Sequence, residues 1–173
     1  MGLSNPMPGH TVTQGFTGSY RAEPSGWLSG TWRARSTAFL GALPRLHLHK
    51  ALDVACPIGT SVLAPERAKL VLQAIDGPTG DHFAYLEIRP GTVLGFNHLS
   101  RVLIPVGSWV DRGKPFALSG ATGHVTGPHL HWSVRHTTGA DKDPRRSSSW
   151  FRYNPARLLV GGDKATTEWI KPV

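Results

Sequence analysis

Two histidines, His129 and His131, alternate with the apolar residues Leu130, Trp132 and Val134. Such alternation of apolar and polar residues is typical of a half-buried β-strand. Because successive side chains on a strand point to opposite faces, both imidazoles lie on one face of the expected sheet. Two neighbouring imidazoles can bind a metal ion and transfer protons, although an ordinary strand edge would show the same pattern.

A second polar pair, His49 and Asp53, has the spacing HxxxD. Catalytic zinc sites use three protein ligands, drawn from imidazole nitrogens and carboxylate oxygens, and keep a fourth position for water. His49, Asp53 and one of His129 or His131 therefore form a candidate zinc site. His47 competes with His49 as a ligand, but only His49 has the HxxxD spacing.

The two segments together resemble the lysostaphin-type zinc endopeptidases of peptidoglycan, also called the LytM or M23 family. The matching strings are HKALD at residues 49–53 and GATGHVTGPHLHWSV at residues 120–134, and the resemblance extends from about Val12 to Leu159. It implies an antiparallel β-sandwich of duplicated strand motifs, with long loops around a substrate groove and at most short helices. It also implies one Zn²⁺ ion and hydrolysis of peptide bonds in the stem or cross-bridge of bacterial peptidoglycan.

The resemblance assigns a role to each matched site residue. It implies that His49, Asp53 and His131 hold the zinc ion. His129 is then the general base for the attacking water. His98 donates a hydrogen bond to the charge that develops in the tetrahedral intermediate.

The chain departs from the family pattern at positions close to the expected site. Residues four apart in a straight strand are separated by roughly 13 Å, so His49 and Asp53 can share a metal only if the chain bends or His49 precedes the strand. Ala51 stands where the family usually has glycine, and the bend must therefore use ordinary backbone angles. Phe96 replaces the usual tyrosine of a YxHLS element, and Ser133 stands where glutamate is frequent.

The remaining sequence predicts an all-β fold with little helix. Its 20 glycines and 14 prolines, without sustained helical periodicity, favour short strands joined by turns. Segments 57–62 and 105–110 share the pattern PxG(S/T)xV, which indicates a weak internal duplication. Pro90-Gly91 is typical of a type II turn in a hairpin, and Asn154-Pro155 of a short capped helix. Strands are expected at 12–16, 69–75, 84–88, 93–96 and 129–134.

Length and charge limit the possible organisation and partners. A chain of 173 residues suits one domain, here residues 1–173 with a core at about 12–159 and a tail at 160–173. The formal charge of +8 favours attraction to a polyanion such as the anionic cell wall. Nucleic acid is the alternative, but no basic helix, zinc-finger spacing or RNP-like motif accompanies the charge. The protein is expected to be a monomer.

The N-terminal residues 1–6 have neither a basic n-region nor an apolar h-region, so no secretory signal is predicted. No apolar run reaches the length of a membrane span. A wall hydrolase without an export signal is expected to be a bacteriophage lysin, released through a holin or carried on the virion; a chain whose signal was removed is the rival. Cys56 is the single cysteine and is expected to be a small buried hydrophobe.

Two functional alternatives remain beside the zinc peptidase. The first is a catalytically inactive LytM-like scaffold that binds the wall or regulates another hydrolase. The second is a basic nucleic-acid-binding β domain. The loops at 17–48 and 136–150 are expected to form the groove walls that determine which peptidoglycan bond is cut.

Overall fold

The computed structural model describes residues 3–14, 49–136, 143, 151–153 and 155. These residues contain eleven β-strands and no α-helix. The prediction of an all-β fold is thus confirmed. The strands predicted at 69–75, 84–88, 93–96 and 129–134 appear with slightly wider bounds, and the strand predicted at 12–16 is described for Val12–Gln14. The loop at 17–48, most of the loop at 136–150 and all of the helix expected at Asn154–Leu159 except Pro155 lie outside the described residues. The extent of the domain, residues 1–173, stays a prediction.

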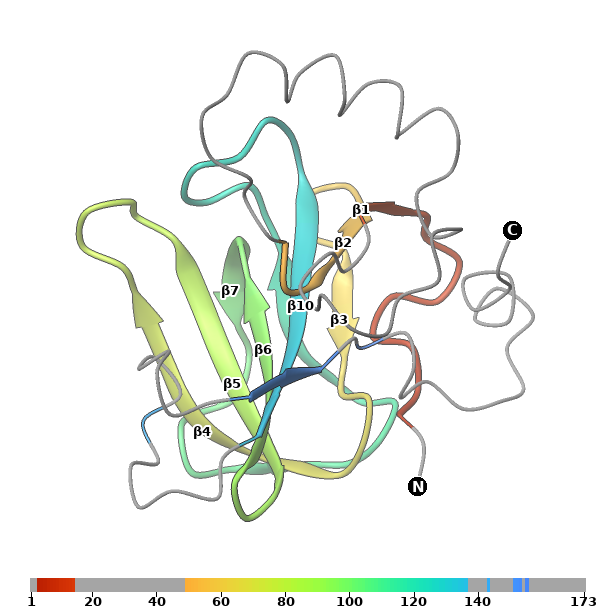
Figure 1. Ribbon diagram of the computed structural model, residues 1–173, viewed down its shortest axis with the longest axis vertical. Helices are drawn as coiled ribbons and strands as arrows, with labels where there is room; N and C mark the ends of the chain where they lie inside the picture. The colour runs from red at the N-terminus through yellow and green to blue at the C-terminus, as the bar shows by residue number, and fades with distance from the viewer. Residues whose placement is uncertain (1–2, 15–48, 137–142, 144–150, 154, 156–173) are drawn as a thin grey trace.

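An antiparallel sheet of eight strands forms the larger layer (Figure 1). β10 lies near its middle, between β2 and β6, and one further strand, β11, pairs with β10 outside the main path. In order of pairing the strands are β1 (Val12–Gln14), β2 (Leu52–Ala55), β10 (His129–His136), β6 (Thr92–Asn97), β5 (His82–Arg89), β4 (Ala68–Ile75) and β8 (Trp109–Val110), with β11 at Phe151–Tyr153.

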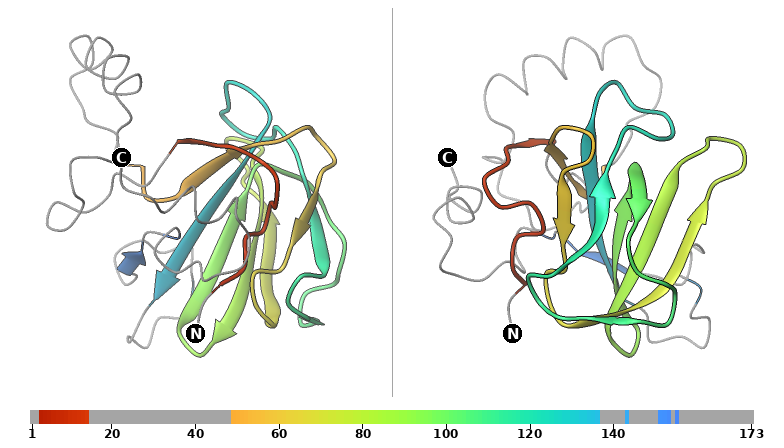
Figure 2. Two further views of the ribbon diagram at one scale, coloured as in Figure 1. Left: turned by 90° about the vertical axis from the view of Figure 1, so that its right-hand side faces the viewer. Right: turned by 180° about the vertical axis from the view of Figure 1, so that it is seen from behind.

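A smaller antiparallel sheet covers one face of the larger one, as the side view in Figure 2 shows. Its strands pair in the order β3 (Ser61–Leu63), β9 (Pro115–Ser119) and β7 (Leu99–Val102). The rings of Phe96 and Phe116 meet across the two sheets, with centroids 4.9 Å apart. Both side chains are fully buried, so the core of this sandwich lies between the sheets.

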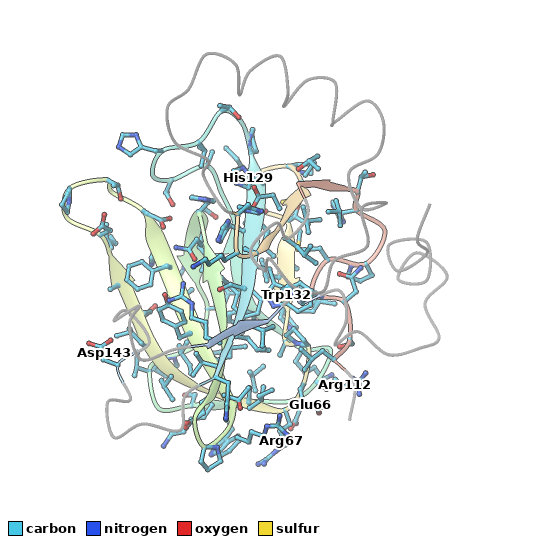
Figure 3. The ribbon with its side chains drawn as sticks, in the orientation of Figure 1. Glu66, Arg67, Arg112, His129, Trp132 and Asp143 are labelled. Carbon is cyan, nitrogen blue, oxygen red and sulfur yellow. The ribbon has the colours of Figure 1, made fainter. Side chains whose placement is uncertain are left out.

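The alternation along β10 divides its side chains between core and groove, as the sequence predicted. Leu130, Trp132 and Val134 are buried in the core cluster. His129 and His131, which point to the other face, are only partly buried. Figure 3 labels His129 near one end of β10 and Trp132 further along the same strand. Burial of these three apolar side chains therefore fixes the position of β10 and of the two histidines on its opposite face.

A second apolar cluster lies on the histidine-bearing face of the large sheet, further along the strands. Tyr85, Gly95 and Ser133 are cross-strand neighbours there. Tyr85 and Val93 are buried, and the guanidinium of Arg135 lies 4.9 Å from the centre of the Tyr85 ring. This packing fills one end of the face and leaves the polar groups at the other end.

Turns predicted from the sequence are present. Gly91 has a φ of 76°, which the third position of a type II turn requires and glycine adopts at little cost. The repeated PxG(S/T)xV segments form the same turn, closed by Thr60 N–H to Pro57 O at 3.3 Å and by Ser108 N–H to Pro105 O at 3.2 Å. They lead into β3 and β8, which belong to different sheets. The local similarity is real, and a larger duplication stays a prediction.

Two smaller expectations concern the cysteine and the membrane. Cys56 is 5% exposed, and burial raises the pKa of its thiol, as expected for a small core residue. Among the residues that the structure describes, no helix is long and apolar enough to cross a bilayer.

Candidate metal centre

Three potential metal ligands converge where β2 and β10 pair. His49 Nε2 lies 3.1 Å from Asp53 Oδ1 and 3.2 Å from His131 Nδ1. The third side of the triangle, from His131 Nδ1 to Asp53 Oδ1, measures 2.9 Å. These three side chains are the one group in the described part of the chain with the spacing of a metal site.

The local backbone explains how residues four apart reach the same point. β2 begins at Leu52, so His49 lies on the segment before the strand, which is one of the two solutions that the sequence allowed. The chain bends at Ala51, which is fully buried, and this residue does not have a positive φ. In the β2–β10 ladder Asp53 is directly opposite His131, so sheet register fixes this pair.

The geometry of the triangle fits a zinc ion. Zinc bound at 2.0–2.1 Å in a tetrahedron places its ligand atoms roughly 3.3 Å apart, close to the 2.9–3.2 Å found between the donor atoms of His49, Asp53 and His131. Two imidazole nitrogens and one carboxylate oxygen leave a fourth position open, as in catalytic zinc sites. The three side chains are 12–24% exposed, so solvent can reach the centre.

The electrostatics favour the protonation states that bind a metal. Burial lowers the pKa of His131, although its hydrogen bond with Asp53 acts in the opposite direction. Burial alone would raise the pKa of the Asp53 carboxyl, but hydrogen bonds from His131 and His49 lower it below its ordinary value. A neutral imidazole and a carboxylate anion are the forms that coordinate metal ions.

His129 lies beside the triangle but outside it. Its Nε2 is 3.8 Å from Asp53 Oδ2, the carboxylate oxygen that the two other histidines leave free. Its Nδ1 is 2.9 Å from the carbonyl oxygen of Gly127. Because a carbonyl oxygen can only accept, Nδ1 carries the hydrogen, and Nε2 presents a lone pair towards the centre when the ring is neutral.

His98 joins the cluster through an unusual backbone conformation. With a φ of 62°, it is the one non-glycine residue with a positive φ in the part of the chain that the structure describes. It lies between β6 and β7, where the chain passes from the large sheet to the small one. Its ring centroid is 4.6 Å from that of His129 and 5.7 Å from that of His131.

Three polar residues to which the sequence assigned no role surround His98. The ring Nδ1 donates to the carbonyl oxygen of Thr122 at 2.8 Å and lies 3.2 Å from Asp81 Oδ1. Asn97 donates through Nδ2 to Asp81 Oδ2 at 2.6 Å. Burial alone would lower the pKa of His98, but the interaction with Asp81 raises it above its ordinary value.

The structure therefore brings all five predicted site residues together: His49, Asp53, His98, His129 and His131. Their separate roles stay predictions. His47, the competing ligand, lies outside the described residues. Cross-strand register explains why Asp53, His131 and Asn97 form one row over β2, β10 and β6.

Comparison with known sequences shows similarity to wall peptidases over this region. Peptidoglycan DD-endopeptidase ShyB of Vibrio cholerae is 38% identical over 88 residues, which are 50% of this chain and 20% of that protein. Lysostaphin of Staphylococcus simulans is 30% identical over 110 residues, 60% of this chain and 22% of the relative. The chain spans about a fifth of the length of the curated relatives it matches.

Solved structures show the same fold. A zinc-containing peptidase from Vibrio cholerae superposes with a TM-score of 0.58 at 26% identity, over 78% of this chain and 36% of that one. The catalytic domain of the antimicrobial peptidase lysostaphin from Staphylococcus simulans gives a TM-score of 0.60 at 23% identity, over 87% and 92% of the two chains.

The sequence profile of Peptidase family M23 matches residues 47–144. This region is more than half of the 173 residues and contains all five converging side chains. The resemblance found in the sequence is confirmed, and the chain belongs to peptidase family M23.

Proposed function

We propose that this protein is a zinc metalloendopeptidase that hydrolyses peptide bonds in the stem or cross-bridge of bacterial peptidoglycan. The observation that carries the proposal is the triangle of His49, Asp53 and His131, with sides of 2.9–3.2 Å, beside two further imidazoles. Membership in a peptidase family supports the reaction class. The names of the DD-endopeptidase relatives support the substrate class.

In this proposal His49, Asp53 and His131 hold one zinc ion. A zinc ion held there would supply a bound water with a pKa lowered towards ~7 and a positive charge to polarise the scissile carbonyl group. His129 is the general base, because its Nδ1–H is taken up by Gly127 O and its Nε2 lone pair is directed to the centre. It removes the proton from the attacking water and returns it to the leaving amine.

His98 stabilises the negative charge that develops on the substrate carbonyl oxygen. Its Nδ1–H is taken by the carbonyl oxygen of Thr122, so Nε2 on the other edge of the ring is the atom available to the substrate. Nε2 can donate only when the ring is protonated. The raised pKa of His98 beside Asp81 favours this imidazolium form. A preorganised donor of this kind is a major source of rate enhancement.

The experiments that test the peptidase function also test two alternative functions. An inactive wall-binding or regulatory scaffold is expected to lack bound zinc or to bind walls without releasing fragments. A nucleic-acid-binding domain is expected to bind DNA with steep salt dependence and to leave walls intact. The complete ligand triangle favours the peptidase over both.

The decisive experiment is digestion of purified sacculi of known cross-link chemistry, followed by mass spectrometry of the released fragments. Because ShyB and ShyA are named DD-endopeptidases, sacculi with direct D,D cross-links are the first substrate and sacculi with glycine bridges the second. We expect zinc-dependent release of fragments cut at one type of peptide bond. Intact sacculi after incubation with zinc-loaded protein would contradict the proposal.

A chelator supplies the control for the metal. Because the ligand side chains are 12–24% exposed, a chelator should remove the ion and abolish digestion. Addition of Zn²⁺ should restore it. Activity that survives exhaustive metal removal would exclude the zinc mechanism. Delivery by a bacteriophage and the monomeric state stay predictions, and the relatives named above come from bacteria.

A further inference from the structure

Asp81 occupies the end of the loop between β4 and β5, where it contacts His98 twice. Its Oδ1 accepts the backbone N–H of His98 at 2.8 Å and lies 3.2 Å from the ring Nδ1 of the same residue. Its Oδ2 accepts a hydrogen bond from Asn97 Nδ2 at 2.6 Å. One carboxylate therefore binds both the backbone and the ring of the residue that has the positive φ.

The unusual backbone conformation of His98 depends on contacts such as the one with Asp81. Alternation along β6 would place His98 on the face opposite to Asn97, in the core between the sheets. The φ of 62° instead brings its ring beside His129. Such a conformation costs free energy for a residue with a side chain and persists only where neighbouring groups hold it. The bond from His98 N–H to the carboxylate is a neighbouring contact of this kind.

The loop before β10 is fitted closely around Asp81. Gly123 has a φ of 80°, and a Cβ added to it would lie 2.8 Å from Asp81 Cβ. From the same loop, Thr122 accepts the His98 Nδ1–H through its carbonyl oxygen. The Thr122 hydroxyl accepts from His82 N–H and donates to the carbonyl oxygen of Leu99. Asp81 thus lies in a packed junction between two loops and the end of β6.

We propose that Asp81 is the positioning residue of His98, holding the ring so that Nε2 faces the substrate beside His129. The catalytic part of this inference rests on the proposed peptidase function. Asp81 itself touches neither the ligand triangle nor His129 in any contact described above, so it acts through His98. The side chains of Asp81 and His98 are 14% and 15% exposed, and water competes only weakly for their hydrogen bonds.

The chain offers a conservative variant at this position. Asp81→Asn keeps an acceptor oxygen for the His98 N–H. Asn97 Oδ1 is buried and has no hydrogen-bond partner among the described residues. If the Asn97 amide turns over, this oxygen can accept from the introduced amide nitrogen, which restores the contact that Oδ2 made. Asp81→Asn should therefore preserve the geometry, whereas Asp81→Ala removes all three contacts.

Another loop supplies a control of equal charge. Asp111 lies on the exposed loop between β8 and β9, where its Oδ1 is 3.4 Å from Arg67 Nε, and its described side-chain contacts include neither Asp81 nor His98. Asp111→Ala removes one carboxylate from the surface without touching the junction. It should leave peptidase activity unchanged.

The first readout is structural and needs no substrate. In the zinc-loaded protein, proton NMR should show a nuclear Overhauser contact between the rings of His98 and His129, whose centroids are 4.6 Å apart. Asp81→Ala should weaken this contact, while Asp81→Asn and Asp111→Ala should keep it. An unchanged contact in Asp81→Ala would overturn the proposal, even if the wild-type protein proved to have no peptidase activity.

The second readout is a double-mutant cycle on wall digestion. Asp81→Ala should lower kcat by about tenfold or more with KM and bound zinc unchanged, as typical of an outer-shell partner. Asp81→Asn should retain most of kcat.

In a His98→Ala background, Asp81→Ala should cause no further loss of kcat, because the effects of residues that act through one another are not additive. A further loss in that background would show a role independent of His98 and overturn the proposal. If Asp81→Ala does not fold, Asp81→Ser replaces it in the same cycle.

Discussion

The two oxygens of Asp53 face different histidines: Oδ1 lies 2.9 Å from His131 Nδ1, whereas Oδ2 lies 3.8 Å from His129 Nε2. The two histidines share one face of β10 and look equivalent in the sequence. The carboxylate distinguishes them, because one is within the ligand triangle and the other is next to it. This difference can be measured.

Replacement of the two histidines should have different effects on the metal. His131→Ala removes a ligand and should lose both zinc and activity. His129→Ala leaves three ligands in place and should keep zinc, while the loss of a general base lowers the rate by about 10² to 10⁴. Metal analysis and digestion assays on the two variants provide the measurement.

Two outcomes would reassign these roles. A zinc-free His129→Ala together with a zinc-loaded His131→Ala would exchange the ligand and the base. Zinc in both variants would place the metal elsewhere, and His47 would then be the first residue to replace.

The packing between β10, β6 and β5 predicts a destabilised variant away from the metal centre. A Cβ on Gly95 would lie 2.7 Å from both Ser133 Oγ and Tyr85 Cε1. Gly95→Ala should therefore lower the free energy of unfolding by about 1–3 kcal/mol through overpacking. Gly77→Ala is the matched control, since a Cβ there would meet nothing within 4 Å. Urea denaturation of both variants tests the expectation.

A second substitution tests the cause of this effect. Ser133 Oγ is buried and has no hydrogen-bond partner among the described residues, so Ser133→Ala alone should cost little. Combined with Gly95→Ala, it should restore part of the lost stability because it removes one of the two clashes. Strictly additive effects would show that the clash with Ser133 is not the cause.

The pair of Asp81 and His98 should make the stability of the zinc-free protein depend on pH. Burial alone would raise the pKa of Asp81, but hydrogen bonds from His98 and Asn97 lower it, so its contribution is present above pH ~4 and lost as pH falls through the folded pKa. The pKa of His98 is raised above 6.5, so its contribution is complete below that pH and lost as pH rises through the folded pKa.

The measurement is a comparison of wild type with Asp81→Asn by urea denaturation over a series of pH values. The stability difference between the two proteins should be largest from about pH 4 to 6.5 and smaller on either side. A difference that stays constant from acid to alkaline pH would show that the charge of this pair contributes nothing to folding.

The positive charge should bring the protein to anionic walls. With a formal charge of +8, binding to intact walls should weaken as salt shortens the Debye length to about 10 Å and below. Co-sedimentation with walls at increasing salt measures this, and a neutral osmolyte at matched osmolarity is the control. Binding that is independent of salt would instead indicate a specific glycan site.

The sequence was sufficient to predict the central strand and the side chains that converge at the candidate metal centre. Alternation from Leu130 to Val134 follows directly from burial of one face, and a register that pairs His131 with Asp53 then brings the ligands together. Strands β7 and β9 were not predicted. β9 begins with Pro115, which has no N–H to donate to a neighbouring strand and so gives only a weak strand signal, and β7 has apolar residues only at its ends.

The support around His98 could not be predicted from local pattern alone. A positive φ at a histidine depends on tertiary contacts, which alternation does not encode. One weak signal in the sequence indicates that Asp81 lies near His98. The β5–β6 hairpin pairs Ala84 with Phe96, and continuing that register to the end of the strands brings Asp81 within one residue of His98. The sequence predicted the hairpin, but it did not predict which residues pair beyond the ends of the two strands.

The ligand triangle also links parts of the chain that are far apart in sequence, since His49 and His131 are separated by 82 residues. In the unfolded chain these ligands do not form a site, so the free energy of metal binding becomes free energy of folding. Zinc bound there would act as a removable cross-link that fastens β2 to β10. The supply of zinc would then set how long the folded protein survives proteases as well as, under the proposed function, how fast it cuts.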